Sequence, residues 1–118
     1  MPKTLPVLDV SAPICCAPLA AGTMDEADAL EVALRLKALA DPVRVRLLTM
    51  VMSAPTGEAC NCDLAPALGL TDGTVSHHLK ALREAGLIVG ERRGTWVYYR
   101  PVRDALSALC RVIDPSCC

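Results

Sequence analysis

Two cysteines separated by one residue, Cys60 and Cys62, stand in the segment "EACNCDL", just before an expected helix start. On a regular helix, side chains two positions apart point about 200° away from each other, so both sulfur atoms reach one ion only where the backbone is still bending into the helix. Two thiolates leave a soft ion under-coordinated. Further ligands must come from elsewhere, and the vicinal pair Cys15-Cys16 is the obvious donor.

A ligand set made of thiolates alone selects soft, thiophilic ions over hard ones. Three thiolates suit pyramidal As(III) or Sb(III), whereas four suit Cd(II), Pb(II) or Zn(II). The remaining cysteines are Cys110, Cys117 and Cys118. Cys110 falls in an apolar stripe and is expected in the core. For the tail pair, a second soft-ion site, redox-prone thiols and inert side chains all remain open.

The composition narrows the class of protein. A chain of 118 residues is long enough for one domain with its own apolar core. Its seven cysteines would form a disulfide scaffold only in a secretory context. The first residues contain prolines instead of a charged segment followed by an apolar run, and no stretch approaches the ~20 apolar residues of a membrane span. We therefore expect a cytoplasmic protein with reduced thiols and no membrane partner.

Three parts are expected along the chain: a flexible arm with a cysteine pair at residues 1–22, a DNA-binding domain at 23–114, and a cysteine-containing tail at 115–118. The first helix, from Asp25 to Ala40, is apolar over most of its circumference, which indicates a dimer interface. Its polar face is predicted to carry Asp28, Glu31 and Arg35.

Capping residues mark the next elements. Asp41 is expected to cap a helix that begins at Pro42, where the missing N–H of proline is harmless. The segment "DLAPALGLTDGTVSHHLKALREAGL" then predicts a helix-turn-helix. Its two helices are expected to be capped by Asp63 and Thr71 and to end at Gly69 and Gly86.

Two further elements complete the pattern. The segment "LIVGERRGTWVYYRPV" alternates around Gly94 and predicts two short strands joined as a β-hairpin, or wing. The last element is predicted to be a helix whose apolar stripe consists of Val102, Leu106, Leu109 and Ile113.

The second helix of the pair can read DNA. With Val75, Leu79 and Leu82 turned inward, its polar side chains suit the major groove, whereas His78 lies near the apolar edge and is expected to be packed and hydrogen-bonded. Residues 71–103 carry six basic and three acidic side chains, although the net charge of the chain is −1. Arginines at the wing tip are expected to meet phosphates. The expected DNA-binding residues are Thr74, Ser76, His77, Lys80, Arg83, Arg92 and Arg93.

The segments "ALADPVRVRLL", "EACNCDL" and "LGLTDGTVSHHLKALREAGLI", followed by a wing, resemble the ArsR/SmtB family of metal- and metalloid-responsive repressors. The resemblance covers residues 25 to about 113. It implies a mainly α fold with a β-hairpin, a winged helix-turn-helix that is homodimeric through its first and last helices. Such a protein binds double-stranded operator DNA when empty and leaves it when an inducer binds.

The resemblance also bears on the inducer. An arsenic-sensing subgroup carries Cys-x-Cys-Asp-Leu-Cys at this helix, and the chain matches it except that Ala65 replaces the third cysteine. That departure makes the arm necessary, so the expected ligands are Cys15, Cys16, Cys60 and Cys62. We expect As(III) or Sb(III), with Cd(II) or Pb(II) as the alternative because a related subgroup joins arm cysteines to the same motif. The zinc and nickel site of the last helix is absent, since that helix has no histidine.

Other interpretations of the cysteines exist. A repressor of the same fold could sense oxidants through disulfides, and Cys60 and Cys62 could be small hydrophobic side chains. A thiol reductase would need an anion-binding loop rich in glycine, which the sequence lacks, so we expect no enzyme. A metal carrier would leave the helix pair and the wing without a role.

Overall fold

The computed structural model describes residues 13–14 and 18–114, and it consists of five α-helices and a three-stranded antiparallel sheet within that part of the chain. The helices are α1 (Glu26–Leu39), α2 (Pro42–Met52), α3 (Asn61–Leu68), α4 (Asp72–Glu84) and α5 (Arg103–Ile113). The strands are β1 (Ala59–Cys60), β2 (Ile88–Arg93) and β3 (Trp96–Pro101), and a short 3₁₀ helix, η1 (Leu19–Ala21), precedes α1.

The helix starts follow the capping rules at three positions. The carboxylate of Asp25 accepts from the N–H of Asp28, that of Asp41 from the N–H of Val43, and the hydroxyl of Thr71 from the N–H of Thr74. Gly69 ends α3 in the left-handed conformation, with φ 67°, which glycine adopts without a Cβ penalty. These local signals were readable in the sequence.

The cap of α3 differs from the prediction. Asp63 lies inside the first turn, and the N-cap is Cys60, whose sulfur accepts from the N–H of Cys62 at 3.1 Å. The helix therefore begins three residues earlier than a cap at Asp63 would allow. The reason is that Cys60 is still extended as the last residue of β1.

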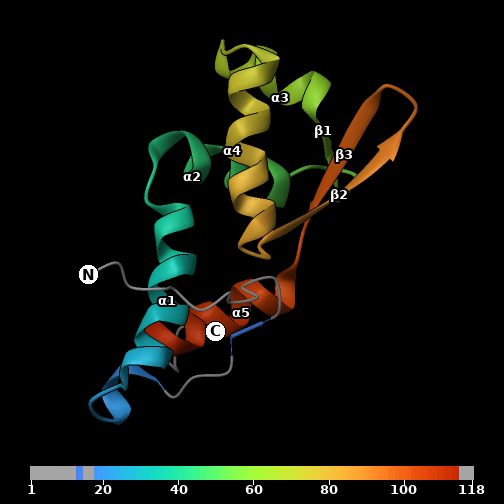
Figure 1. The fold of residues 1–118 in the computed structure, drawn as a ribbon. Coiled ribbons are helices and arrows are strands. Elements are labelled where there is room, and N and C mark those ends of the chain that lie inside the picture. The colour runs from blue at the N-terminus through green and yellow to red at the C-terminus, as the bar shows by residue number, and fades with distance from the viewer. Residues whose placement is uncertain (1–12, 15–17, 115–118) are drawn as a thin grey trace.

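The sheet has the order β1-β3-β2, with the hairpin β2–β3 forming the predicted wing. Strand β1 was not predicted. It pairs antiparallel with β3 through Ala59 opposite Tyr99 and Cys60 opposite Tyr98. The segment that carries the cysteine pair is thus part of the same sheet as the wing (Figure 1).

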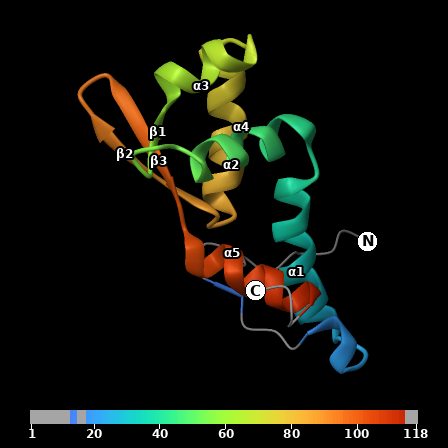
Figure 2. The same ribbon diagram turned by 180° about the vertical axis from the view of Figure 1, so that it is seen from behind.

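Two apolar clusters organise the molecule. The larger one joins α2, α3, α4 and the base of the wing around the fully buried Leu47, Val75, Leu79 and Leu82. The smaller one consists of Ile14, Val32 and Val112, with Met24 and Ala108 against it. Figures 1 and 2 show α1 and α5 together at one end of the molecule, and α3 with the wing at the other.

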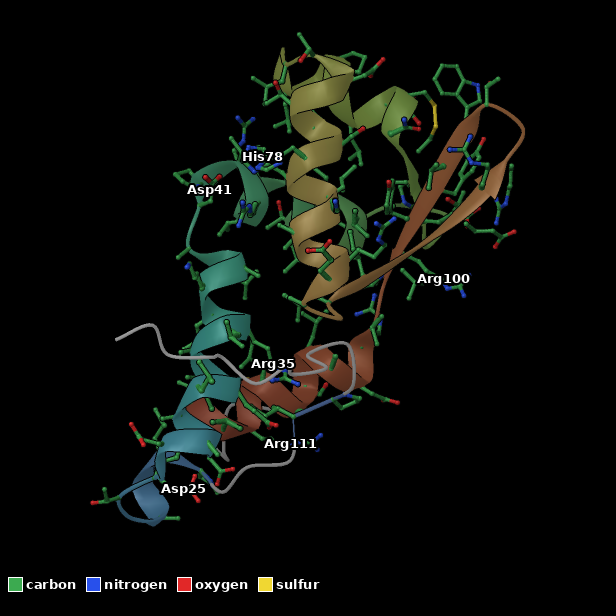
Figure 3. All side chains as sticks on the ribbon, in the orientation of Figure 1. Asp25, Arg35, Asp41, His78, Arg100 and Arg111 are labelled. Atoms are coloured by element: carbon green, nitrogen blue, oxygen red, sulfur yellow. A yellow bond between two sulfur atoms is a disulfide. The ribbon has the colours of Figure 1, made fainter. Side chains whose placement is uncertain are left out.

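Two predictions about helix faces are wrong. Arg35 was placed on the polar face of α1, yet it is 4% exposed, and its guanidinium donates to the carbonyl of Glu31 (Figure 3). On α5 the buried side is Ala105, Leu109 and Val112, whereas Ile113 is 47% exposed. Because α5 packs on α1 through Val112, its core side is rotated away from the predicted stripe.

Among the residues that the structure describes, no helix has the length and apolar character needed to cross a lipid bilayer.

Candidate sensor pair and nucleic-acid interface

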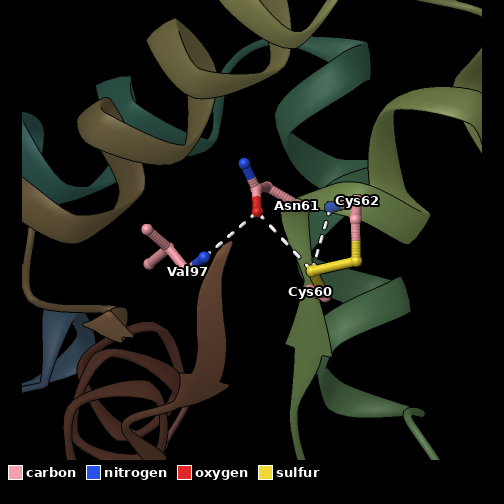
Figure 4. The surroundings of a disulfide bond; sticks show 4 residues. All are labelled: Cys60, Asn61, Cys62 and Val97. Atoms are coloured by element: carbon pink, nitrogen blue, oxygen red, sulfur yellow. Dashed lines mark hydrogen bonds between the residues drawn. A yellow bond between two sulfur atoms is a disulfide. The ribbon is translucent and has the colours of Figure 1, made fainter. Parts of the chain in front are cut away.

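Cys60 and Cys62 bring their sulfur atoms together where β1 runs into α3. Cys60 keeps extended dihedrals, φ −82° and ψ 142°, so the two side chains do not diverge as they would on a helix. The pair is joined by a disulfide, and the Cα atoms are 5.0 Å apart (Figure 4). Cys60 is buried and Cys62 is half-buried. The bend expected ahead of the helix is therefore present.

The pair alone does not make a complete metal site. Within the described residues, no group of three or more histidine, cysteine or acidic side chains is arranged to hold an ion. A disulfide offers no thiolate, so only the reduced pair can supply two soft ligands from one place. Cys15, Cys16, Cys117 and Cys118 lie outside the described residues.

Two observations bear on the other cysteines. Ile14, directly before the arm pair, is buried against Val32 of α1 and Val112 of α5. Cys110, which was expected in the core, is half-buried on α5 and takes part in a disulfide.

The cysteine pair is attached to the wing by main-chain and side-chain contacts. Asn61, the residue between the two cysteines, accepts a hydrogen bond from the N–H of Val97 on β3 at 3.2 Å (Figure 4). Its oxygen also lies 3.6 Å from the sulfur of Cys60. In the β1–β3 pairing Cys60 lies opposite Tyr98. Together these contacts place the two sulfur atoms beside the wing.

Arg93 adds a second attachment. Its guanidinium forms a two-point ion pair with the carboxylate of Glu58, just ahead of β1, with one N···O distance of 2.9 Å. It also contacts Glu91 at 3.2 Å and lies over the ring of Tyr98, 4.5 Å from its centre. The hydrogen bond from Arg93 lowers the pKa of Glu91. Arg93, predicted to meet phosphates, thus has three protein partners in this structure.

Arg92 differs from its neighbour. Within the described residues its side chain makes no hydrogen bond or ion pair, and it is exposed at the wing. It is therefore the arginine of the pair whose guanidinium is available to a phosphate.

Helix α4 has the predicted two faces. Val75, Leu79 and Leu82 are fully buried. The side chains that were predicted to read DNA from this helix are all exposed: Thr74, Ser76, His77, Lys80 and Arg83. Lys80 forms an exposed contact with Glu84, at 3.8 Å, and an exposed ion pair of this kind competes weakly with a DNA phosphate.

A groove of about 420 Å³ lies between α4 and the wing. Its basic side chains are Lys80 and Arg83 from α4 and Arg92 from β2. Asn61 lines the same groove. A positively charged groove of this kind suits the sugar-phosphate backbone of DNA.

A contact that sequence reasoning missed joins α2 to α4. The Nε–H of Arg44 donates to Nδ1 of His78 at 3.1 Å, which requires a neutral imidazole with its proton on Nε2. His78 is half-buried and hydrogen-bonded, close to its predicted setting. Figure 3 shows His78 beside Asp41, the cap of α2. The partner could not be read from sequence because it lies 34 residues away.

The carboxylate of Asp41, which caps α2, has a lowered pKa. Partial desolvation raises the pKa of Asp41, but the hydrogen bonds from the N–H groups of Arg44 and Val43 and the nearby positive charge of Arg44 together lower it by more, so the net pKa lies below the ordinary value.

Comparison with known proteins agrees with this geometry. The model for the bacterial regulatory proteins of the arsR family matches residues 41–89. The arsenic resistance transcriptional regulator ArsR1 of Pseudomonas putida is 47% identical over 64 residues, which are 54% of this chain and 48% of that protein. This chain thus aligns with about half of that relative. The arsenical resistance operon repressor of Bacillus subtilis is 42% identical over 84 residues, covering 71% of this chain and 76% of the relative.

Solved structures show the same fold. The antimony-specific transcriptional repressor AntR superposes with a TM-score of 0.60 at 32% identity, over 80% of this chain and 87% of that one. The homodimeric winged helix-turn-helix domain Mb0332 of Mycobacterium bovis gives a TM-score of 0.60 at 34% identity, over 77% and 84% of the two chains.

Proposed function

Because this chain belongs to the arsR family of bacterial regulatory proteins, we propose that it is a transcriptional repressor that binds operator DNA as a homodimer and releases it when As(III) or Sb(III) binds to cysteine thiolates. The relatives named for arsenical resistance and antimony specificity support a metalloid as inducer. They are transcriptional regulators, in agreement with the expectation that the chain is not an enzyme.

The observation that carries this proposal is the meeting of the sulfur atoms of Cys60 and Cys62 beside the wing. Once reduced, the pair supplies two thiolates at a fixed place, and a third thiolate completes the trigonal set that As(III) and Sb(III) prefer. Cys15 or Cys16 is the proposed source of that third ligand. If both arm cysteines bind, four thiolates result, and Cd(II) or Pb(II) becomes the alternative inducer.

The position of Ile14 favours an arm from the other subunit. Ile14, the described residue that directly precedes the arm pair in the sequence, packs on α1 and α5. The junction of β1 and α3, which carries Cys60 and Cys62, lies toward the other end (Figure 1). A dimer related by two-fold symmetry can bring the arm of one chain to the pair of the other.

Binding at this place can weaken DNA binding because the pair is joined to the wing. A ligand shifts the equilibrium only through its different affinity for the free and DNA-bound forms, and such couplings are typically ~1–3 kcal/mol. A complete thiolate cage that pulls on Cys60 changes the β1–β3 edge and, with it, the groove beside α4.

The first prediction is that Cys60→Ser binds operator DNA as tightly as the wild type but is no longer released by arsenite. The measurement is fluorescence anisotropy of a labelled duplex, selected by the wild-type protein from a randomised pool, under reducing conditions. Cys110→Ser is the matched control and should still be released. Release lost in Cys110→Ser and kept in Cys60→Ser would move the site to α5 and contradict the proposal.

The same assay identifies which ion is the inducer and whether the arm cysteines of one chain serve the site of the other. Arsenite, antimonite, cadmium and lead are titrated against the wild type and against double Cys→Ser variants at 15/16, 60/62 and 117/118. Mixed dimers of the 15/16 and 60/62 variants regain one site only if the ligands cross between subunits. No release of such mixed dimers, alongside normal release of the wild type, would place all ligands in one chain.

A redox-sensing repressor is a second candidate, and the disulfide between Cys60 and Cys62 favours it. In that case oxidation itself releases DNA, and the closed pair excludes metalloid. Peroxide that releases the wild-type protein in the absence of metalloid, but not Cys60→Ser, would support this function over the first.

A further inference from the structure

The side-chain amide of Asn61 has an oxygen that accepts hydrogen bonds and an NH₂ group that donates them. Its side-chain oxygen accepts from the N–H of Val97 at 3.2 Å and lies 3.6 Å from the sulfur of Cys60. A backbone N–H can only donate, so the amide oxygen must face β3 and the NH₂ group must point the other way. The donor end is therefore directed away from the contact with the wing strand (Figure 4).

The NH₂ group of Asn61 is open to solvent. No hydrogen bond from it is found within the described residues. In the same part of the chain, no buried side-chain nitrogen or oxygen lacks a partner. An unpaired NH₂ group must then be accessible, and Asn61 is half-buried, with the rest of its side chain held by β3.

Asn61 also lines the groove between α4 and the wing. This groove is lined by Asn61, by Lys80 and Arg83 from α4, and by Arg92 from the wing. Asn61 is also the first residue of α3, whose N-terminal end carries a partial positive charge that attracts anions. Four groups that favour a phosphate thus surround one groove.

We infer that Asn61 is a DNA-contacting residue, which donates from its NH₂ group to a backbone phosphate of the bound duplex in the groove between α4 and the wing. The inference rests on the proposed function, because it assumes that this face binds DNA. Asn61 then contacts DNA at one end of its amide and the sensor sulfur at the other.

This position gives the cysteine pair a short route to DNA. The amide plane is rigid, so a shift of the oxygen that contacts Cys60 and Val97 also moves the NH₂ group. A change of state at Cys60 therefore displaces a phosphate donor through a single side chain, without rearrangement of the core.

The test is Asn61→Asp, assayed reduced and free of metalloid. Aspartate keeps an oxygen that can accept from Val97, and a carboxylate at the start of a helix is favourable, so the thermal unfolding midpoint should stay the same or rise. Its anionic oxygen replaces the donor that faces the groove. We expect DNA binding to weaken by about tenfold or more.

Two duplexes and two further variants sharpen the test. A phosphate contact carries no sequence information, so Asn61→Asp should weaken binding of the selected duplex and of an unrelated duplex by similar factors. Ser53→Asp adds the same charge on an exposed residue outside the groove and should bind like the wild type. Asn61→Ala removes the donor without adding a charge, and its affinity for DNA should fall several-fold. This variant replaces Asn61→Asp in the test if the aspartate variant does not fold.

The outcomes separate the two proposals. Asn61 variants that fold and bind both duplexes within twofold of Ser53→Asp would overturn the inference, while the proposed function would stand. A wild-type protein that binds no duplex would overturn both. Tight duplex binding that arsenite does not release would remove only the metalloid as inducer, and the comparison at Asn61 would still decide the inference.

Discussion

Asp41 is a residue whose charge serves local structure. Its carboxylate holds the N–H groups of Val43 and Arg44 at 2.8 and 3.3 Å, and Arg44 in turn donates to His78. The cap thus fixes the start of α2 and, through Arg44, the position of α2 against α4. The Arg44–His78 contact thus joins the cap of α2 to α4, the helix whose exposed side chains are proposed to contact DNA.

We predict that Asp41→Ala lowers the midpoint of thermal unfolding at pH 7 by roughly 5 °C, because two N–H groups lose their acceptor. The pKa of Asp41 is lowered in the folded state, so its contribution is complete above the unfolded value of 3.8 and is lost as the pH falls through the lower folded pKa. The measurement is thermal unfolding of both proteins from pH 7 downward. A difference that persists unchanged at the acidic end would contradict this role.

At this scale, much was predictable from sequence. The caps at Asp41 and Thr71, the glycine turn at Gly69 and the inward side of α4 depend on neighbouring residues alone, and all are present. Arg35 is buried on α1, a helix that packs on α5 through Val32 and Val112, and α5 lies far along the chain. A local sequence pattern assigns a charged side chain to the exposed face of a helix. The predicted exposure of Arg35 was therefore wrong.

The wing is the element in which glycine has a packing role. A Cβ on Gly90 of β2 would lie 3.0 Å from the ring of Tyr99 and 3.1 Å from a methyl group of Val97. Tyr99 is buried, so its ring has little room to move. The close approach of the two strands at this point therefore requires the absence of a side chain.

We predict that Gly90→Ala destabilises the protein by about 1–2 kcal/mol, because the added methyl group overpacks the wing. Gly73→Ala is the matched control. It lies in α4 with open space around its would-be Cβ, so alanine should stabilise by about 0.5 kcal/mol. Chemical unfolding curves give both values. Equal effects of the two substitutions would show that packing at Gly90 is unimportant.

The elements were predicted unevenly. The helix pair and the hairpin have a clear period and clear ends, and the structure confirms them. Strand β1 has two residues, too few for any period, and it exists only because β3 lies beside it. The stripe on α5 was misplaced for a related reason, since the buried side of a helix is set by the neighbour on which it packs.

The whole molecule leaves apolar surface at the end formed by α1 and α5. Leu36 on α1 is 39% exposed and Ile113 on α5 is 47% exposed, next to the small cluster around Val32 and Val112. Exposed apolar groups on two adjacent helices favour a second chain as the cover. The homodimeric state of the similar Mycobacterium bovis domain agrees with this interpretation.

We predict that the chain is a dimer in solution, with about twice the 12.5 kDa mass of one chain, and that Ile113→Glu makes it monomeric and weakens DNA binding. Burying an unpaired carboxylate at the interface is unfavourable. Val45→Glu, at an equally exposed position on α2, is the control and should remain dimeric. Sedimentation velocity measures both, and a dimeric Ile113→Glu would place the interface elsewhere.

At the scale of the whole molecule, the fold class and the family were predictable from the sequence. The order of the motifs along the chain is enough to identify both, and it can be read without knowing which residues are in contact. It predicted that Cys60 and Cys62 could converge, and the structure brings their sulfur atoms together. Cys15 and Cys16, the further ligands expected from sequence, are far from this pair along the chain and lie outside the described residues. Those ligands stay a prediction.

The shortness of β1 has a consequence for the speed and reversibility of a response. A strand of two residues can detach from β3 by giving up very few main-chain hydrogen bonds, while Leu47, Leu64 and Leu79 stay in place. Under the proposed function, inducer binding would need to open only this one edge of the sheet, with the rest of the domain left folded. For the proposed repressor, such a local change predicts that DNA binding returns quickly once the inducer is removed.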